Sequence, residues 1–212
     1  MHPYLKIEME VKERIIQEMN RLILTKSCKL ITMDEVASNL GISKRTLYEN
    51  FKDKNQLIHE SISDQFKKAH KEVEKIIQKS ENTLVSFMLI TIKANQSVTN
   101  MAYDNINDIK KYYPKIYDDV LLNHIDVQKK NTTRLLRKAI EEGLIIKRVD
   151  INLLQNMLRF YIFQCSKREY MLLDPTLSAS KLFNIQLFIT IRGISTPKGI
   201  EIIDKYQDII FN

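Results

Sequence analysis

The stretch of sequence that decides the fold is residues 32–54, which read T-M-D-E-V-A-S-N-L-G-I-S-K-R-T-L-Y-E-N-F-K-D-K. Thr32 and, three residues later, Glu35 form the capping-box pattern with which many helices begin. That helix is expected to end at Gly41, because glycine readily adopts the positive φ that a tight turn between helices often needs. Ala37 has a side chain small enough for a second helix to approach closely. The stretch therefore predicts two short helices joined by a tight turn.

The second of these helices is polar where it begins and apolar where it would face its neighbour. Ser43 is the expected N-cap of a helix over residues 44–50. The apolar residues expected to fill the small core between the helices are Val36, Leu40, Ile42 and Leu47, and Phe51 is assigned to the core as well. A helix-turn-helix inserts the polar N-terminal end of its second helix into the major groove of DNA. The stretch therefore predicts a DNA-binding element.

Along most of the remaining chain, apolar residues recur at three- and four-residue steps, the spacing of amphipathic helices. The helices expected from this spacing and from capping residues cover residues 11–25, 54–79, 84–97, 103–112, 115–142, 151–172, 178–194 and 200–211. Only 4 Gly and 4 Pro occur in 212 residues, too few for the tight turns of a β-sandwich. We therefore expect an all-α protein, with an N-terminal three-helix domain over residues 1–60 and a second helical domain over residues 61–212.

Composition and charge exclude several classes of protein. Two cysteines, Cys28 and Cys165, cannot supply a disulfide framework, and no window approaches the roughly 18 apolar residues of a transmembrane helix. The first ten residues lack the apolar segment of a signal peptide, so we expect a cytoplasmic protein. The net charge of +7 fits a polyanionic partner. However, residues 1–60 hold 10 of the 33 basic and 9 of the 26 acidic residues, so most of the excess positive charge lies outside the predicted DNA-binding domain.

Residues 11–60 resemble the DNA-binding domain of the tetracycline-repressor (TetR) family. The resemblance rests on the apolar first helix, the threonine-capped second helix and the block G-I-S-K-R-T-L-Y-E-N-F-K-D-K. This block fits the family pattern of Gly, an apolar residue, Ser, two variable residues, Thr or Ala, Leu or Ile, Tyr, two variable residues, Phe, and Lys six residues after the Tyr. The loop before Thr32 departs from the pattern, because S-C-K-L-I lacks the Gly-aromatic pair common in the family. The path between the first two helices is therefore left open.

The resemblance implies a role in DNA binding for seven residues: Thr32, Ser43, Lys44, Arg45, Thr46, Tyr48 and Lys54. Tyr48 and Lys54 fall where the family contacts phosphate, and Lys54 also lies at a helix N-terminus, which favours anions. Thr32 would contact phosphate while capping its helix. The candidates for contacts to base edges are Lys44, Arg45 and Thr46, and Arg45 is suited to a bidentate contact with guanine.

Three alternatives for these residues stay open. Tyr48 could be purely structural, with its ring packed under the short helix, and Lys44 could reach only phosphate. Glu49 could accept a hydrogen bond from cytosine or pair with Arg45.

The C-terminal domain of the family dimerises and usually binds a small effector, so the resemblance implies a homodimer with an unknown small-molecule effector. The family usually builds its dimer interface from two late helices. In this chain the apolar residues of those helices are Leu153, Leu154, Met157, Leu158, Phe160, Tyr161, Leu182, Ile185, Phe188 and Ile189. The same stripe could instead be the core of the monomer.

An effector pocket is expected among the middle helices, lined by apolar and aromatic side chains. The candidates are Phe66, Phe87, Met88, Met101, Tyr103, Tyr112, Tyr113, Tyr117 and Phe163. The alternative is that these residues are core residues, as most aromatic residues at helical spacing are.

Catalysis has little support in the sequence. The four histidines form no His-x-x-x-His pair and none lies near a cysteine in metal-ligand spacing. Adjacent carboxylates such as Asp118 and Asp119 diverge by about 100° on a helix and cannot act as one acid–base site. We therefore expect no enzyme activity, no metal and no cofactor.

The sequence thus predicts a homodimeric, ligand-responsive transcriptional regulator of TetR type, a repressor that binds a palindromic DNA operator. One alternative is a helical enzyme or scaffold protein with an incidental helix-turn-helix. The other is a regulator that senses a protein partner or has no effector.

Overall fold

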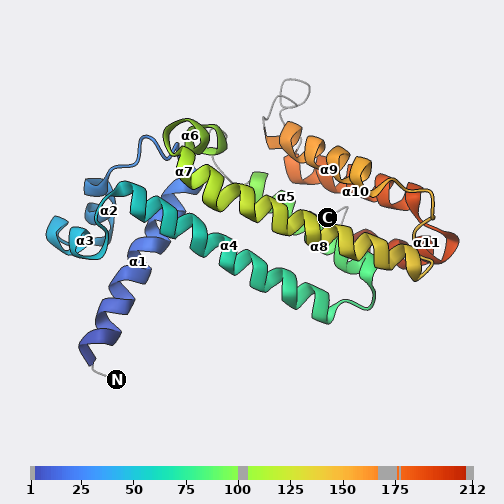
Figure 1. Ribbon diagram of the computed structural model, residues 1–212, viewed down its shortest axis with the longest axis horizontal. Coiled ribbons are helices and arrows are strands. Elements are labelled where there is room, and N and C mark those ends of the chain that lie inside the picture. The colour runs from blue at the N-terminus through green and yellow to red at the C-terminus, as the bar shows by residue number, and fades with distance from the viewer. Residues whose placement is uncertain (1–2, 100–104, 167–175, 177, 209–212) are drawn as a thin grey trace. The chain divides into compact units, whose positions relative to one another are not determined.

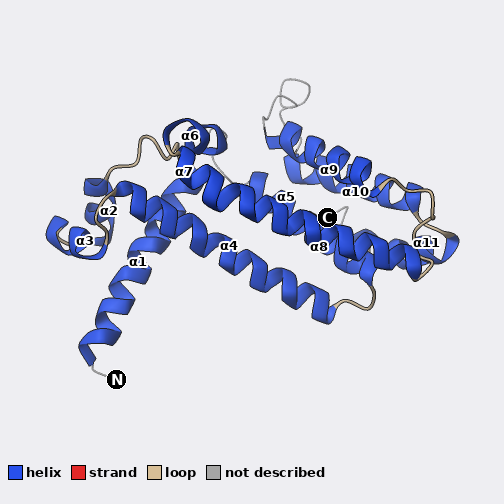
Figure 2. Cartoon of the chain, in the orientation of Figure 1, coloured by secondary structure: helices blue, strands red, loops and turns tan. Residues whose placement is uncertain are grey.

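The computed structural model describes residues 3–99, 105–166, 176 and 178–208 (Figure 1). The regular structure over these residues is helical (Figure 2), apart from one isolated antiparallel bridge between Ile145 and Ser195. The predicted all-α class is confirmed. Among the described residues, no helix is both long and apolar enough to cross a membrane.

The helices, in chain order, are α1 (Pro3–Thr25), α2 (Met33–Leu40), α3 (Lys44–Asn50), α4 (Lys54–Lys79), α5 (Thr83–Thr99), α6 (Asn105–Tyr112), α7 (Pro114–Ile116), the π-helix η1 (Tyr117–Leu122), α8 (Asn123–Glu141), α9 (Ile151–Ser166), α10 (Ala179–Ile194) and α11 (Pro197–Asp204).

The chain divides into two compact units. The first unit comprises residues 1–71 and 104–124, and the second comprises residues 72–103 and 125–212. α6, α7 and η1 belong to the first unit. This unit therefore differs from the domain predicted over residues 1–60, and the predicted domain boundary stays a prediction.

Local hydrogen bonds set the ends of α2 and α3 where the sequence predicts them. The hydroxyl of Thr32 accepts a hydrogen bond from the N–H of Glu35 at 3.1 Å, and the hydroxyl of Ser43 accepts one from the N–H of Thr46 at 3.0 Å. Gly41 ends α2 with a φ of 64°, the left-handed conformation that the turn requires. The helix-turn-helix therefore follows from contacts within a few residues of the chain.

The core of the first unit forms where α2 packs against α1 and α3. Its fully or almost fully buried residues include Ile15, Met19, Ile23, Val36, Ala37, Leu47, Phe51, Leu57 and Ile58. Leu40 and Ile42, which were expected in this core, are only half-buried. The predicted packing of the two short helices is therefore confirmed at its centre, and these two residues lie at its edge.

The core of the second unit is built around α5 and α10, which pack against each other and against α9 and α11. α5 is buried from Thr83 to Met88 without interruption. α9 and α10 lie side by side (Figure 1), and Leu158 of α9 and Phe183 and Leu187 of α10 are buried in the same core cluster. Each helix of this unit therefore buries one face, and α5 buries most of its surface.

The segment predicted as one helix over residues 115–142 is divided in the structure. α7 begins at Pro114, which occupies the first turn because it has no N–H to donate. The π-helix η1 follows, and α8 then runs to Glu141, with Gly143 at a φ of 69° after it, as expected of a C-terminal glycine. A hydrogen bond of a π-helix spans five residues, whereas one of an α-helix spans four, and apolar spacing does not distinguish the two over six residues.

The predicted start of the last helix, at residue 200, is wrong. α11 begins at Pro197, and the hydroxyl of Thr196 accepts a hydrogen bond from the N–H of Gly199 at 3.2 Å. Thr before Pro is an N-cap signature that outweighs the apolar spacing from which the start was inferred. The predicted ends of the helices over 103–112, 151–172 and 200–211 extend beyond the described residues.

Two Gly→Ala substitutions should change the free energy of unfolding in opposite directions, because Gly41 lies in a left-handed turn and Gly193 lies in a helix. Gly41→Ala should lower the free energy of unfolding by about 1 kcal/mol, because a positive φ is costly for an L-residue with a Cβ. Gly193→Ala, within α10, should raise it by about 0.5–1 kcal/mol, because alanine favours the helix. An added Cβ meets no atom within 4 Å at either site, so packing does not mask the backbone effect. Urea unfolding midpoints measure both changes, and shifts in the same direction would contradict the assigned turn.

Candidate nucleic-acid interface

α3 is anchored by one face and presents the other to solvent. Leu47 and, directly after the helix, Phe51 are fully buried. The side chains of Lys44 and Arg45 are 67% and 88% exposed, and Tyr48 is 51% exposed. Tyr48 is therefore not a core residue, and both its predicted phosphate contact and the structural alternative stay open. The outer face of α3 therefore displays two cations and a phenol.

Both cations of α3 are paired with nearby carboxylates. Arg45 Nε lies 2.8 Å from Glu49 Oε1 on the same helix, and Lys44 Nζ lies 2.7 Å from Asp34 Oδ2 at the start of α2. The hydrogen bond to the carboxylate raises the pKa of each cation above its ordinary value, so both stay charged. Because these pairs are exposed, water and salt screen them. A phosphate or a guanine edge can therefore compete for the same two cations.

The hydroxyl groups among the predicted DNA contacts have structural partners. Thr32 and Ser43 cap α2 and α3, and Thr46 Oγ1 lies 2.8 Å from Ser43 Oγ. A hydroxyl has one proton and two lone pairs, so a capping bond leaves capacity for a further partner. Capping by these residues is thus compatible with a phosphate contact.

Lys54 lies at the beginning of α4, as predicted, but its ammonium group has a partner within the protein. Lys54 Nζ donates a hydrogen bond to the carbonyl oxygen of Lys29 at 2.9 Å and lies 5.8 Å from the centre of the Tyr113 ring. Burial lowers the pKa of Lys54. The sequence gives no sign of this contact, because both partners are far from Lys54 in the chain.

The loop between α1 and α2 is held by Asn105, the first residue of α6. Its fully buried side chain accepts a hydrogen bond from the backbone N–H of Cys28 at 2.6 Å. It also donates to the carbonyl oxygens of Lys26, at 3.0 Å, and Ile23. The path of the loop, which the sequence left open, is therefore fixed by a residue 77 positions away.

Further contacts join α6 to the same loop. The hydroxyl of Ser27 forms a hydrogen bond with the carboxylate of Asp108, and Lys29 Nζ donates to the hydroxyl of Tyr112 at 3.2 Å. Burial, reinforced by the negative charge of Asp108, raises the pKa of the Cys28 thiol to about 11. Ser27, Asn105 and Asp108 are absent from the sequence-based predictions, because no local pattern marks a contact between distant segments.

The residues predicted to line an effector pocket are divided between the two units. Phe87 and Met88 are buried in the core of the second unit, whereas Tyr112 and Tyr113 lie beside Lys29 and Lys54 in the first unit. Phe87 and Met88 are therefore core residues of that unit, and a part for them in an effector pocket stays a prediction. The remaining candidates are Phe66 and Tyr117 in the first unit, Phe163, which is 51% exposed on α9, and Met101 and Tyr103, which lie outside the described residues.

Phe66 belongs to a cluster with two histidines of the first unit. The rings of Phe66 and His124 stack with their centroids 3.8 Å apart, and His124 Nδ1 lies 3.1 Å from His70 Nε2. Burial, followed by the influence of His70, lowers the pKa of His124 to about 4, so His124 is neutral near pH 7. Within the described residues, no group of three or more His, Cys, Asp or Glu side chains is placed to hold a metal ion.

The predicted dimer residues differ in exposure. Leu153, Met157 and Phe160 of α9 are 59%, 44% and 60% exposed, and Ile189 of α10 is 59% exposed. Leu154 is 95% buried in the core of its own unit, as is Leu158, and a part for these two in a dimer interface stays a prediction. The half-buried candidates are Tyr161, Leu182, Ile185 and Phe188. One face of α9 thus leaves large apolar side chains in solvent.

The helix-turn-helix part of the chain is similar in sequence to known regulatory proteins. Residues 15–61 match the family described as bacterial regulatory proteins, tetR family. The uncharacterized HTH-type transcriptional regulator YvaF of Bacillus subtilis (strain 168) is 38% identical to this chain over 105 residues. That match covers 48% of this chain and 53% of YvaF, so it spans about half the length of the relative.

Solved structures share the fold over most of the chain. A putative transcriptional regulator from Saccharomonospora viridis, in complex with choline, has a TM-score of 0.75 at 16% identity and matches 89% of this chain and 99% of its own. The transcriptional regulator FadR from Bacillus subtilis, in complex with stearoyl-CoA, has a TM-score of 0.68 at 16% identity, with 86% and 98% covered. The N-terminal part of this chain is therefore similar to the helix-turn-helix domain of the TetR family of regulators, and its fold is similar to that of solved transcriptional regulators over most of the chain.

Asn105→Ala should release the loop between α1 and α2. The free energy of unfolding should fall by about 1–3 kcal/mol, because buried backbone groups lose their partners. In a Cys165→Ser background, labelling of Cys28 by a maleimide should become faster, because the opened loop exposes its thiol. The control is Asn107→Ala, an exposed residue of the same helix, which should change neither quantity. Equal labelling rates in the Cys165→Ser protein, with or without Asn105→Ala or Asn107→Ala, would show that Asn105 does not hold the loop.

Proposed function

We propose that this chain is a homodimeric repressor that binds a palindromic DNA operator and releases it in response to a small effector. The observation that carries the proposal is α3, a capped helix that buries Leu47 and exposes Lys44, Arg45 and Tyr48. A helix-turn-helix directs the N-terminal residues of its second helix toward base edges in the major groove. Arg45 and Lys44 occupy those positions.

Each predicted contact residue has a role in this docking. Arg45 leaves Glu49 and forms a bidentate contact with guanine, for which its guanidinium geometry is suited. Lys44 and Thr46 are the other candidates for contacts to base edges, and Tyr48 contacts the phosphate next to that base. Thr32 and Ser43 contact phosphate at the helix ends that they cap. Lys54 contributes positive charge to the same backbone, and its N-terminal position on α4 favours an anion.

A dimer is proposed because one short helix binds DNA weakly and because the half-sites of a palindrome lie about 34–36 Å apart. The exposed face of α9 supports this, since Leu153, Met157 and Phe160 recur at steps of four and three residues. Exposed apolar residues grouped in this way favour a protein contact. Ile189 on the neighbouring α10 extends the same candidate surface, and Tyr161, Leu182, Ile185 and Phe188 border it.

The effector is proposed to act through the separation of the two α3 helices in the dimer. It can weaken DNA binding only by as much as its affinity differs between the two separations. The structural neighbours described above are complexes with choline and with stearoyl-CoA. These two ligands have different chemistry, so they support a response to a ligand without indicating which ligand.

The DNA contact is tested by selecting bound duplexes from a random pool at two salt concentrations. The wild-type protein should enrich a palindrome, with affinity that falls steeply as salt rises. Arg45→Ala should weaken operator binding by about 1–3 kcal/mol and relax the preference at one base pair in each half-site. Lys54→Ala should weaken all sequences alike and reduce the salt dependence. If Arg45→Ala kept the wild-type consensus and affinity, the assigned docking would be wrong.

The dimer is tested by replacing exposed apolar residues of α9. Leu153→Glu combined with Phe160→Glu should shift the protein from dimer to monomer in sedimentation equilibrium, because two desolvated carboxylates are unfavourable in an apolar contact. Ile146→Glu is the matched control, since Ile146 is 42% exposed and lies outside α9 and α10. A dimer that persists in the double variant would place the interface elsewhere.

A further inference from the structure

The excess positive charge outside the helix-turn-helix is concentrated on α8. This helix of 19 residues carries five cations, Lys129, Lys130, Arg134, Arg137 and Lys138, and only two carboxylates, Asp126 and Glu141. Successive residues of an α-helix are about 100° apart, so the spacing of the five cations places them on one half of the helix. The opposite half contains Leu135, Leu136 and Ala139, which are buried in the core of the second unit.

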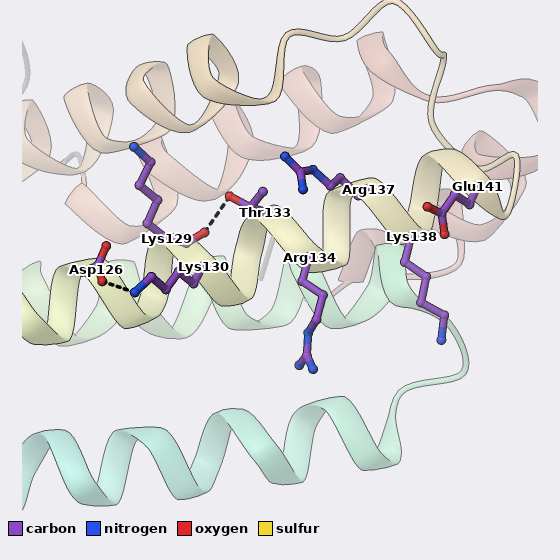
Figure 3. A pocket seen from close by; sticks show the side chains of 8 residues that line it. All are labelled: Asp126, Lys129, Lys130, Thr133, Arg134, Arg137, Lys138 and Glu141. Atoms are coloured by element: carbon purple, nitrogen blue, oxygen red, sulfur yellow. Dashed lines mark hydrogen bonds and ion pairs between the residues drawn. The ribbon is translucent and has the colours of Figure 1, made fainter.

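These charged residues line an open groove with a volume of about 600 Å³. Its lining consists of Asp126, Lys129, Lys130, Thr133, Arg134, Arg137, Lys138 and Glu141. Figure 3 shows that Lys129 and Arg137 extend to one side of α8, whereas Arg134 and Lys138 extend to the other. A ligand lying along the helix would therefore have cations on both sides.

The contacts beneath the groove hold α8 in place. Gln155 of α9 is 96% buried, and its amide donates hydrogen bonds to Thr132 Oγ1 at 2.6 Å and to the carbonyl oxygen of Lys129 at 3.1 Å. Thr133 Oγ1 donates to the carbonyl oxygen of Lys129 at 2.8 Å. Because the helix is fixed from below, its cationic face is presented in a defined orientation.

The positive charge of this face is only partly neutralised. Lys130 pairs with Asp126 at 2.7 Å, and Lys138 lies 3.9 Å from a carboxylate oxygen of Glu142. In the part of the chain that the structure describes, neither Arg134 nor Arg137 pairs with a carboxylate. Like charges four residues apart on a helix repel each other. This row therefore does not stabilise α8, and an external anion would relieve the repulsion.

We propose that this groove on α8 binds a small organic anion that carries at least two phosphate or carboxylate groups. Lys129 and Lys138 are nine residues apart, about 13.5 Å along the helix, so a single phosphate cannot contact both ends of the row. The guanidinium groups of Arg134 and Arg137, between them, are suited to bidentate contacts with such groups. The binding of this anion does not depend on the proposed function. Its further role as the effector of the repressor does rest on the proposed function.

The groove fits a small anion better than it fits a nucleic acid. Its volume falls within the roughly 300–1,000 Å³ typical of small-molecule sites. Asp126 precedes the row of cations and Glu141 follows it, so a long polyanion that continued past either end would meet a carboxylate. The two acidic residues therefore limit the length of anion that the row accommodates.

The test compares two double variants that remove the same charge. Arg134→Gln with Arg137→Gln alters the groove, whereas Lys147→Gln with Arg148→Gln alters exposed residues of the loop after α8. Titration calorimetry with ATP and with citrate should show saturable binding to the wild-type protein and to the loop variant. Binding to the groove variant should be at least about tenfold weaker, because two charge-assisted contacts are lost. Inorganic phosphate should bind far more weakly than either probe.

Three outcomes would overturn the proposal. The first is the absence of saturable binding of both ATP and citrate to the wild-type protein. The second is an equal loss of binding in the groove and loop variants, which would indicate a general effect of net charge. The third is a selective loss of binding to a duplex of scrambled sequence in the groove variant, which would make the groove a nucleic-acid surface.

The experiment separates this inference from the proposed function. Both double variants should bind the operator as the wild-type protein does when no anion is present, because neither changes the helix-turn-helix. If the operator is bound but neither ATP nor citrate is, the groove inference alone is wrong. If an anion binds but no operator is found, the proposed repressor is wrong and the groove remains an anion site.

Discussion

The buried side chain of Asn105 provides the interaction on which the arrangement of the first unit depends. The loop between α1 and α2 places the backbone N–H of Cys28 and the carbonyl oxygens of Ile23 and Lys26 in the interior, where an unpaired group costs about 1–3 kcal/mol. A carboxamide satisfies such groups because it both donates and accepts. α2 follows this loop and α3 follows α2 through Gly41. The position of the exposed face of α3 relative to α1 therefore depends on an amide from α6.

The same contacts explain why the compact first unit includes segments that are distant in the chain. Lys54 at the start of α4 and Tyr113 before α7 lie beside the loop, and Ser27 and Asp108 join it to α6. A division at residue 60 would separate groups that form hydrogen bonds with one another. The helix-turn-helix is therefore supported by helices that follow α5 in the sequence, and its stability depends on them.

We propose anionic partners for two surfaces, the outer face of α3 and the groove on α8. The cations of these two surfaces differ in how they are paired with carboxylates. On α3 the two cations are paired with Asp34 and Glu49, so binding to DNA exchanges one set of partners for another. On α8 the cations outnumber the nearby carboxylates, and the two arginines keep no such partner among the described residues. Net charge by itself does not indicate which part of this chain we propose to bind DNA. The proposal rests instead on a few exposed residues of one short helix.

The sequence by itself determined the all-α class, the helix-turn-helix and the exposed residues of α3, because capping by Thr32 and Ser43, the turn at Gly41 and apolar spacing act within about four residues. Only the tertiary structure decided the partner of Lys54, the role of Asn105, the burial of Phe87 and Met88 and the grooved face of α8. Some of these features depend on contacts between residues that are far apart in the chain. The others depend on which face of a helix is covered by its neighbours. Local spacing carries no information about such contacts, because they exist only after distant helices have packed together.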